Sequence, residues 1–334
     1  MNLTRRAFVE RGGVAAAGAA TLVLSQRRLW ASAVQGQAPV QSTASPPAAS
    51  PTDRFASMRA AAATTPIKAT KLRDTVFLLQ GVGGNMVAHV GPDGKLLIDS
   101  SLATAATRLK HALAELDANP LKLLINTHWH FDHTDGNAAQ HDAGAFIMAH
   151  TNTRVRLSQP QDIKLFNIHL PPAPTSALPQ QTFDEKESLF FNNDELSMVH
   201  LQAAHTDSDI YIFLKNQNLL HTGDIWFNGF YPVIDEGSGG TINGMIRAAE
   251  DCLAIADDKT KIVPGHGPLG DKAGLAKYRD MLATVATRIE KLKASGQTID
   301  QVNAARPTAD FDEAWGNGML KPDVFVGLIY RTLP

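Results

Sequence analysis

The chain has 334 residues, which is enough for one or two domains with a full-sized core. Its 31 Lys and Arg residues are balanced by 33 Asp and Glu residues, so it has no basic field to hold a polyanion, and we expect no nucleic-acid partner. A single cysteine excludes a disulfide within these residues and a cysteine-rich metal cage.

Residues 1–33 resemble a twin-arginine export signal. Arg5 and Arg6 precede Phe8, the apolar stretch GVAAAGAATLVL follows, and an A-x-A pattern ends at Ala33. We therefore expect cleavage after Ala33, transient contact with the twin-arginine export machinery and a periplasmic location. The alternative is an uncleaved membrane anchor. The apolar run is shorter than the roughly 20 residues that cross a bilayer, so we expect no stable anchor.

Residues 34–65 are rich in Ala, Ser, Pro and Thr and lack regularly spaced apolar residues. This composition predicts a flexible linker. From residue 66 the pattern changes to apolar segments separated by turn residues. Residues 66–334 are predicted to form the globular domain, with a helical extension at the C-terminus.

Strands and helices alternate along the predicted domain. Strands are expected in TKLRDTVFLLQG and in MVAHVGPDGKLLIDSS, where a PDG turn joins two of them. A helix over 102–116 and a strand in LKLLINTH precede a short helix ending at Gly144 and a strand in AFIMAH. Residues 158–182 are irregular and rich in proline. Beyond them, strands are expected in ELSMVHLQAAH, DIYIFLKNQNLLHTGD and KIVPGHG, and helices in TINGMIRAAEDCLAIAD and AGLAKYRDMLATVATRIEKLKASG. This alternation predicts a layered α/β architecture.

The segment THWHFDHTDGN places His128, His130, Asp132 and His133 in H-x-H-x-D-H spacing where a strand meets a loop. Residues two apart in an extended segment point to the same side, so His128 and His130 can converge on one ion. The turn at Asp132 and His133 directs this pair towards a second ion. Solvated loop histidines are the alternative, but four ligand-type residues in six positions argue against it. Imidazole and carboxylate ligands suit Zn²⁺. Mn²⁺ or Fe²⁺ also becomes suitable as the number of oxygen ligands increases.

Three further candidate ligands lie where apolar strands end. They are His205 in AAHTDSD, Asp224 in LLHTGDIWF and His266 in VPGHG. Each opens a polar or glycine-rich loop, from which a side chain can face a cleft. Together with the first motif they predict a site for two metal ions.

With HWHFDH, AAHT, TGD and VPGHG in this order, residues 70–290 resemble the hydrolases of the metallo-β-lactamase superfamily. The resemblance implies an αββα sandwich of two mixed sheets between helices, with the site at one edge. It also implies a ligand set: His128, His130 and His205 on one Zn²⁺, Asp132, His133 and His266 on the other, and Asp224 bridging or bound to the second ion. Asp99 in LLIDSS would brace the ligand loop without touching metal.

Two adjacent cations lower the pKa of a shared water, so that metal-bound hydroxide can attack a polarised carbonyl near neutral pH. Asp132 would be both ligand and catalytic group, orienting the nucleophile or passing its proton. We therefore expect an exported dinuclear zinc hydrolase of small molecules. Its substrate would be a cyclic amide or ester, with β-lactams as the leading candidates.

Two positions depart from the β-lactamases of the cysteine-bearing class. Asp224 stands where those enzymes carry a cysteine, and Phe227 stands where they carry a lysine for the drug carboxylate. Asp224 is instead similar to the ligand of glyoxalase II-like thioesterases, although the tail after residue 290 does not resemble their glutathione-binding domain. A thioesterase (hydroxyacylglutathione hydrolase-like) or a lactonase is the enzymatic alternative. A metal-binding accessory protein of an exported redox system is the non-enzymatic one.

Other side chains have less specific interpretations. His221 is expected to be a satisfied core histidine rather than a partner of a ligand, and Cys252 a small core residue. His169, beside the proline-rich loop, either lines the cleft or is exposed. Four aromatic residues either wall a substrate pocket or pack beneath a loop: Trp226, Phe227, Phe230 and Tyr231.

Overall fold

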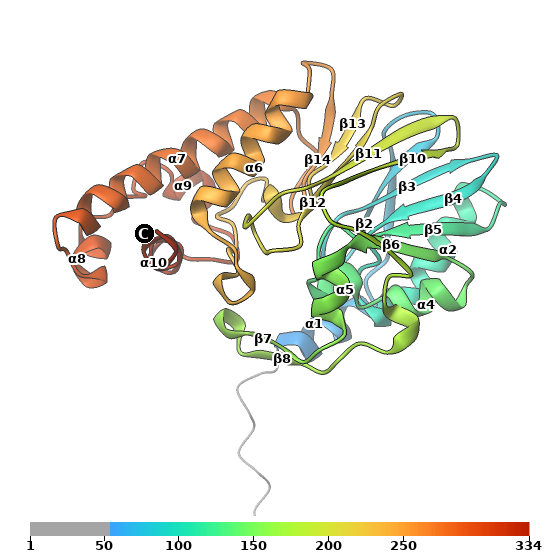
Figure 1. Cartoon of the computed structure of the whole chain (residues 1–334), viewed down its shortest axis with the longest axis horizontal. Coiled ribbons are helices and arrows are strands. Elements are labelled where there is room, and N and C mark those ends of the chain that lie inside the picture. Colours follow the sequence, from blue (N-terminus) through green and yellow to red (C-terminus); the bar gives the residue numbers. More distant parts are fainter. Residues whose placement is uncertain (1–53, 334) are drawn as a thin grey trace, which may run out of the picture. The chain divides into compact units, whose positions relative to one another are not determined.

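The computed structural model describes residues 54–333, which form two packed β-sheets with helices on their outer sides (Figure 1). The first sheet has seven strands, in the spatial order β1 (Lys68–Lys71), β2 (Val76–Gln80), β3 (Met86–Gly91), β4 (Gly94–Ile98), β5 (Leu121–Ile125), β6 (Phe146–His150) and β9 (Gln181–Phe183). β1 to β4 pair antiparallel, whereas β4, β5, β6 and β9 pair parallel. Parallel pairs need crossovers; α2 (Ala106–Leu116) connects β4 to β5, and α4 (Asn137–Asp142) lies between β5 and β6.

The second sheet has five strands, in the spatial order β10 (Lys186–Phe191), β11 (Asp194–His200), β12 (Ile210–Leu214), β13 (Leu219–His221) and β14 (Lys261–Val263). β10 to β13 pair antiparallel, and β14 pairs parallel with β13 after the crossover helix α6 (Ile242–Ile255). The carboxyl ends of β13 and β14 therefore lie at the same edge.

Alternation along the strands divides the side chains between apolar layers. In β4, Leu96 and Ile98 face the second sheet, whereas Leu97 packs in the layer that contains Leu109 of α2. In β12, Ile212 faces the first sheet. These layers form the predicted αββα sandwich.

The helices of the C-terminal region cover the outer side of the second sheet (Figure 1). α7 (Lys272–Ala294) packs on α6, and three helices follow it: α8 (Ile299–Ala304), α9 (Asp312–Trp315) and α10 (Pro322–Thr332). Thr298 and Gln301 form a capping box at the start of α8. Phe325 and Ile329 of α10 are buried in the same apolar cluster as α7. The described region after residue 290 thus consists largely of helices.

The helix α1 (Arg54–Ala62) corrects the last part of the predicted linker. The ring of Phe55 packs edge-on against Phe131, with 4.9 Å between ring centroids. Arg59 Nε donates a hydrogen bond to Asp135 Oδ2 at 2.9 Å. These contacts with the rest of the domain order this segment.

The region 158–182 contains short elements where the sequence predicted an irregular segment. They are β7 (Gln161–Ile163), the 3₁₀ helix η2 (Lys164–Phe166), β8 (Ile168–Leu170) and the 3₁₀ helix η3 (Thr175–Ala177). β7 and β8 pair antiparallel. Strands of three residues are too short to produce a periodic pattern, so the sequence does not reveal them.

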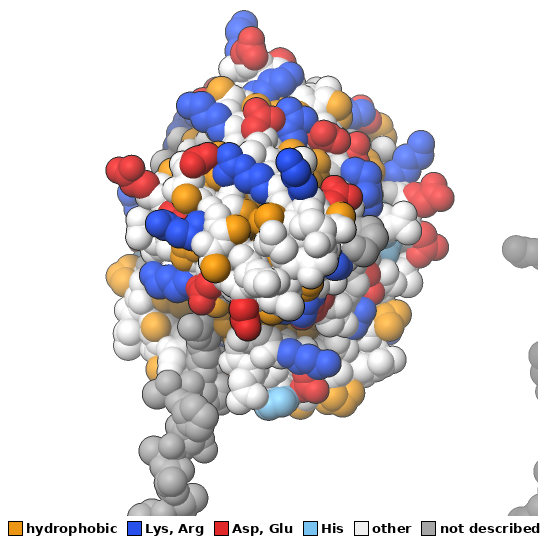
Figure 2. Space-filling view, turned by 90° about the vertical axis from the view of Figure 1, so that its left-hand side faces the viewer, with side chains coloured by type: hydrophobic (Ala, Val, Ile, Leu, Met, Phe, Trp, Pro, Cys, Tyr) orange, Lys and Arg blue, Asp and Glu red, His pale blue; other side chains and the backbone are white. Residues whose placement is uncertain are grey.

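The predicted export signal, residues 1–33, and residues 34–53 of the predicted linker lie outside the described residues. Within residues 54–333, none of the helices combines the length and the apolar character that crossing a membrane requires. On the face drawn in Figure 2, acidic and basic side chains are interspersed, in keeping with the near balance of charges in the sequence.

Candidate metal centre

The predicted ligands lie in loops and short helices that follow strands. His128, His130, Asp132 and His133 follow β5, the last two on α3 (Phe131–Thr134); His205 lies between β11 and β12, Asp224 follows β13, and His266 follows β14. The structure brings all seven side chains together in two adjoining groups.

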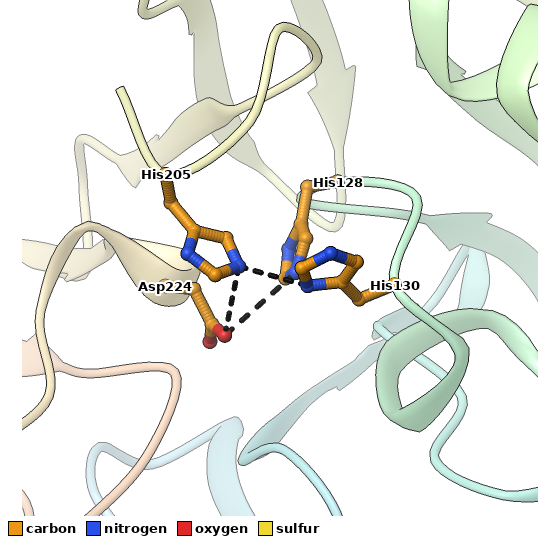
Figure 3. A group of neighbouring side chains, drawn as sticks. All are labelled: His128, His130, His205 and Asp224. Atoms are coloured by element: carbon orange, nitrogen blue, oxygen red, sulfur yellow. Dashed lines mark hydrogen bonds and ion pairs between the residues drawn. The ribbon is translucent and has the colours of Figure 1, made fainter. Parts of the chain in front are cut away.

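The first group contains His128, His130, His205 and Asp224, with one ligand atom from each within 4.8 Å of the others (Figure 3). His205 Nε2 lies 2.8 Å from His130 Nδ1, and Asp224 Oδ2 lies 3.4 Å from His205 Nε2. All four residues are buried. Ligand atoms around a tetrahedral zinc ion are about 3.4 Å apart, so these spacings suit one shared ion.

The second group contains Asp132, His133 and His266. Asp132 Oδ2 lies 3.2 Å from His266 Nε2, which lies 3.4 Å from His133 Nε2. Asp224 adjoins this group as well, because its Oδ1 is 3.2 Å from His133 Nε2 and its Oδ2 is 3.4 Å from His266 Nε2. The Asp224 carboxylate therefore lies between the groups, in the position of a bridging ligand.

Hydrogen bonds on the far side of the rings orient the ligands. His205 Nδ1 donates to the carbonyl of Val233 at 2.7 Å, which leaves Nε2 with its lone pair towards the first group. His133 Nδ1 lies 2.7 Å from Asp99 Oδ2, and Asp99 also accepts hydrogen bonds from Thr127 N and Oγ1 at 2.8 Å each. The expectation that Asp99 braces the ligand loop is thereby confirmed.

Asp235 is a functional residue that the sequence reasoning missed. Its Oδ2 lies 3.0 Å from His130 Nε2, so that Nδ1 of this ring faces His205. Gly237 N and Ser238 Oγ donate to the same carboxylate. Burial would raise the pKa of Asp235, but the hydrogen bonds from His130 and Ser238 lower it to about 2. The available signal was a pair of acids, Asp235 and Glu236, between the apolar YPVI and the turn residues GSGG.

The charges of the site favour ionised carboxylates. Burial would raise the pKa of Asp132, but the charges of His133 and His266 lower it to about 2. The pKa of Asp224 lies well below its usual range, because attraction to the same histidines exceeds the effect of burial. Burial lowers the pKa of His266, yet Asp224 and Asp132 outweigh it and raise the value to about 9. The cluster therefore attracts positive charge.

Two of the histidines are neutral donors of lone pairs. Burial and neighbouring histidines lower the pKa of His128 well below its usual value and that of His205 to about 4. His128 Nε2 is buried, with no hydrogen-bond partner within residues 54–333. Coordination of a metal would satisfy this nitrogen. Imidazole and carboxylate together suit Zn²⁺, Mn²⁺ or Fe²⁺, so the donor set fits two such ions.

Close backbone contacts fix the loops that carry the ligands. A Cβ at Gly84 would lie 2.1 Å from His133 Cε1, so only glycine allows this approach. A Cβ at Gly265 would lie 1.9 Å from Asp224 Oδ1. Asn85 N donates to the Gly265 carbonyl at 2.7 Å and holds the VPGHG loop against the segment directly before β3.

A cavity of about 440 Å³ opens onto both groups. It is bounded by five of the ligands, His130, Asp132, His205, Asp224 and His266, and by Met58, Phe131, Ile163, Phe166, Ile168, Phe227, Val233, Gly318 and Met319. The sequence did not decide whether four aromatic residues line a pocket or pack beneath a loop. Of these, Phe227 lines the cavity, and its ring stacks on His266 with 5.2 Å between centroids. The others do not line it, and Trp226 and Tyr231 are buried in the core.

His221, His169 and Cys252 lie outside the two ligand groups. His221 Nε2 donates to the Asn85 carbonyl at 3.2 Å, and its Nδ1 accepts from Gly223 N at 3.0 Å, which confirms a satisfied core histidine. His169 pairs with Asp162 on the surface and does not line the cavity. Cys252 is buried in the core, as predicted.

Known proteins share this architecture. A family model described as the metallo-beta-lactamase superfamily matches residues 79–266. A metallo-beta-lactamase from Pontibacter korlensis is similar in structure, with a TM-score of 0.54 at 18% identity; the match covers 65% of this chain and 99% of that one. DIM-1 metallo-beta-lactamase is similar with a TM-score of 0.53 at 18% identity. The match covers 66% of this chain and 98% of that one.

A second kind of protein has the same fold. The inverting sec-alkylsulfatase Pisa1 from Pseudomonas sp. gives a TM-score of 0.58 at 17% identity, and the match covers 79% of this chain and 50% of that one. At these identities the likeness is one of fold, and it agrees with the sandwich described above. The ligand positions at the strand ends come from this chain's own sequence and geometry.

Proposed function

The chain belongs to the metallo-beta-lactamase superfamily, and from this premise we propose that it is an exported hydrolase that cleaves a cyclic amide or ester at a centre of two zinc ions. The observation that carries this proposal is the convergence of seven histidine and aspartate side chains in two groups beside one cavity. β-Lactams are the leading candidates from the sequence.

The proposed roles follow from the positions of the side chains. His128, His130 and His205 would hold one ion, Asp132, His133 and His266 the other, and Asp224 would join them. When bound, two such ions supply an ionised water near neutral pH and polarise the substrate carbonyl. Asp132, which its neighbours keep ionised, would orient the nucleophile and accept a proton at its carboxylate.

Metal analysis and substrate turnover test the proposal together. We expect two metal ions per chain and turnover of at least one member of a panel containing a chromogenic cephalosporin, a lactone, a carboxylic ester and a thioester. Removal of metal with a chelator should abolish turnover, and zinc should restore it. Two bound ions without turnover of any member would favour a metal-binding accessory protein of an exported redox system instead.

A thioesterase or lactonase is the second candidate function. The apolar lining of the cavity favours it, because no lysine or arginine within residues 54–333 lines this cavity to pair with a drug carboxylate. Cephalosporin turnover without turnover of the lactone, the carboxylic ester or the thioester would exclude it.

We propose export by the twin-arginine route from the residues at the start of the chain. Arg5, Arg6 and the pattern ending at Ala33 support it. In cells, the mature protein should appear in the periplasm and begin at Val34, as measured by fractionation and mass spectrometry. The double substitution Arg5→Lys and Arg6→Lys should retain the precursor in the cytoplasm. An intact N-terminus in the exported protein would contradict the cleavage site.

A further inference from the structure

The walls of the cavity are of one chemical kind. Apart from the five ligands, its nine lining residues are all apolar. No charged, hydroxyl or amide side chain other than those ligands lines it in the described part of the chain. Arg59, next to Met58 in sequence, lines a separate cavity of about 200 Å³ and pairs with Asp135. An anionic group on a substrate would therefore find no cationic side chain among the residues 54–333 that line this cavity.

One wall comes from α1, which precedes the first sheet. Met58 lines the cavity from this helix. The helix is held in place because Arg59 Nε donates to Asp135 Oδ2 at 2.9 Å and Thr104 Oγ1 donates to the Arg59 carbonyl at 2.6 Å. Asp135 also accepts from Ala103 N at 2.8 Å. Met58 is therefore a fixed part of the wall.

A second wall comes from the hairpin of β7 and β8 with the 3₁₀ helix between them. Ile163 and Ile168 are 3% and 2% exposed and line the cavity together with Phe166. The two isoleucines are opposite each other in the antiparallel register. This pairing gives the wall a rigid apolar base.

A third wall comes from the C-terminal extension, through Gly318 and Met319. A Cβ at Gly318 would lie 2.2 Å from Phe230 Cβ, so glycine lets the chain approach this ring closely. The Tyr231 amide donates to the Trp315 carbonyl at 3.0 Å. This contact holds the extension at the cavity, while Met319 remains 43% exposed at its rim.

From these walls we propose that the substrate is an uncharged ester or lactone whose apolar arm lies along Met58, Phe166 and Met319. The inference rests on the proposed hydrolase function. Water would add to the acyl carbon, the acyl C–O bond would break, and the alcohol oxygen would take the proton. Burying an anion against apolar walls without a partner is costly, whereas each buried methylene improves affinity about three- to fourfold. Carboxylate-bearing lactams and sulfate esters should therefore be poor substrates.

A matched pair of esters tests the charge preference on the zinc-loaded protein. 4-Nitrophenyl hexanoate and mono-4-nitrophenyl adipate differ only in a terminal methyl or carboxylate group. We expect kcat/KM to be at least about tenfold higher for the hexanoate. Equal values for the two esters would overturn the inference and leave the hydrolase function standing.

A second pair provides a readout that does not depend on turnover. Hexanophenone and 6-oxo-6-phenylhexanoate carry the same two arms on a ketone that cannot be hydrolysed. Calorimetry should show tighter binding of the neutral ketone, to the metal-free protein as well. If no ester is hydrolysed, the proposed function fails, while this comparison still decides the charge preference of the cavity.

Substitutions at the rim locate the preference. Met319→Lys places a cation at a partly exposed position and should lower the ratio of neutral to anionic binding about threefold. Met319→Gln removes the thioether without adding charge, and it should not shift the ratio towards the anion to the same extent. Met58→Lys repeats the test from the wall formed by α1. If neither lysine variant shifts the ratio, these walls do not set the preference and the inference is wrong.

Discussion

The ligand groups and the cavity walls are built in different ways. All seven ligands lie within residues 79–266, the range that matches the family, whereas Met58 and Met319 lie outside it. His128 is fully buried, while Met319 is 43% exposed. Buried hydrogen bonds hold the ligand rings, whereas Met58 and Met319 are held by contacts of α1 and of the C-terminal extension with the rest of the domain. We infer that the sandwich core fixes the chemistry and that the added segments select the substrate.

This comparison predicts that metal content and turnover can be changed separately from the preference between neutral and anionic ligands. Substitutions among the ligands and their partners should change metal content and turnover without changing the preference between neutral and anionic ligands. Substitutions in the walls should do the reverse. The predictions below test this separation, beginning with the largest effect.

Asp132→Asn should have the largest effect, lowering kcat/KM by about 10² to 10⁴. The substitution keeps the size of the side chain and removes the charge that His133 and His266 stabilise, so the proton acceptor is lost. Steady-state kinetics on the hexanoate ester would measure it, with metal content determined on the same sample. The exposed Asp258 provides the matched control, Asp258→Asn. Unchanged turnover in Asp132→Asn would place the chemistry elsewhere.

Asp235→Asn should weaken metal binding about 10- to 100-fold. The carboxylate orients His130 through a 3.0 Å hydrogen bond, and a neutral amide holds the ring less strongly. Competition with a chromophoric chelator would give the zinc dissociation constant. The neighbouring Glu236, whose partner is Arg331 on the surface, serves as the control in Glu236→Gln. Equal zinc affinities in the two variants would show that Asp235 does not support the centre.

The ligands were predictable because histidine and aspartate residues recur at spacings that are typical of metal sites. H-x-H-x-D-H and the strand-end positions of His205, Asp224 and His266 stand out in the sequence, and the structure brings them together. Asp235 was not predicted because two acids followed by glycines are typical of any exposed turn. Its role depends on the contact with His130, which is 105 positions away along the chain.

The fold was predictable to a similar extent and for a similar reason. Long apolar strands and the amphipathic helices α6 and α7 have clear periods, so their positions agree with the structure. The helix α1 and the β7–β8 hairpin have no such period. Contacts such as Phe55 with Phe131 order α1, and a single sequence does not reveal them.

Arg59→Met should have a smaller effect, confined to the wall. It removes the ion pair with Asp135 that holds α1, and a partly exposed pair is worth up to about 1 kcal/mol. We expect KM for the hexanoate ester to rise up to about fivefold, with kcat and metal content unchanged. Arg247→Met on the exposed side of α6 is the control. A loss of bound metal in Arg59→Met would mean that wall and ligands are not separable.

The smallest predicted effect concerns a stacked pair of histidines, one buried and one half-buried, that does not line the cavity. His150 and His200 lie with ring centroids 3.7 Å apart and an interplanar angle of 12°. His150 Nε2 donates to the Asp184 carbonyl, and Nδ1 accepts from Asn152 N at the start of α5 (Thr151–Leu157). Both nitrogens of the neutral ring are thus occupied. Burial first, and then His200, lower the pKa of His150.

The lowered pKa of His150 predicts that acid destabilises the core. Because the unfolded chain binds this proton at a higher pH than the folded one, stability from His150 is present above the ordinary histidine value of about 6.5 and falls as the pH drops below it. The slope from one such group is at most about 1.4 kcal/mol per pH unit. His150→Asn keeps an acceptor for Asn152 N without a titrating ring. Urea unfolding at about pH 7.5 and about pH 5.5 should therefore show the wild type losing more stability than this variant. An equal loss in both proteins would assign the acid sensitivity to other groups, and the control His111→Gln, at an exposed site, should behave as the wild type does.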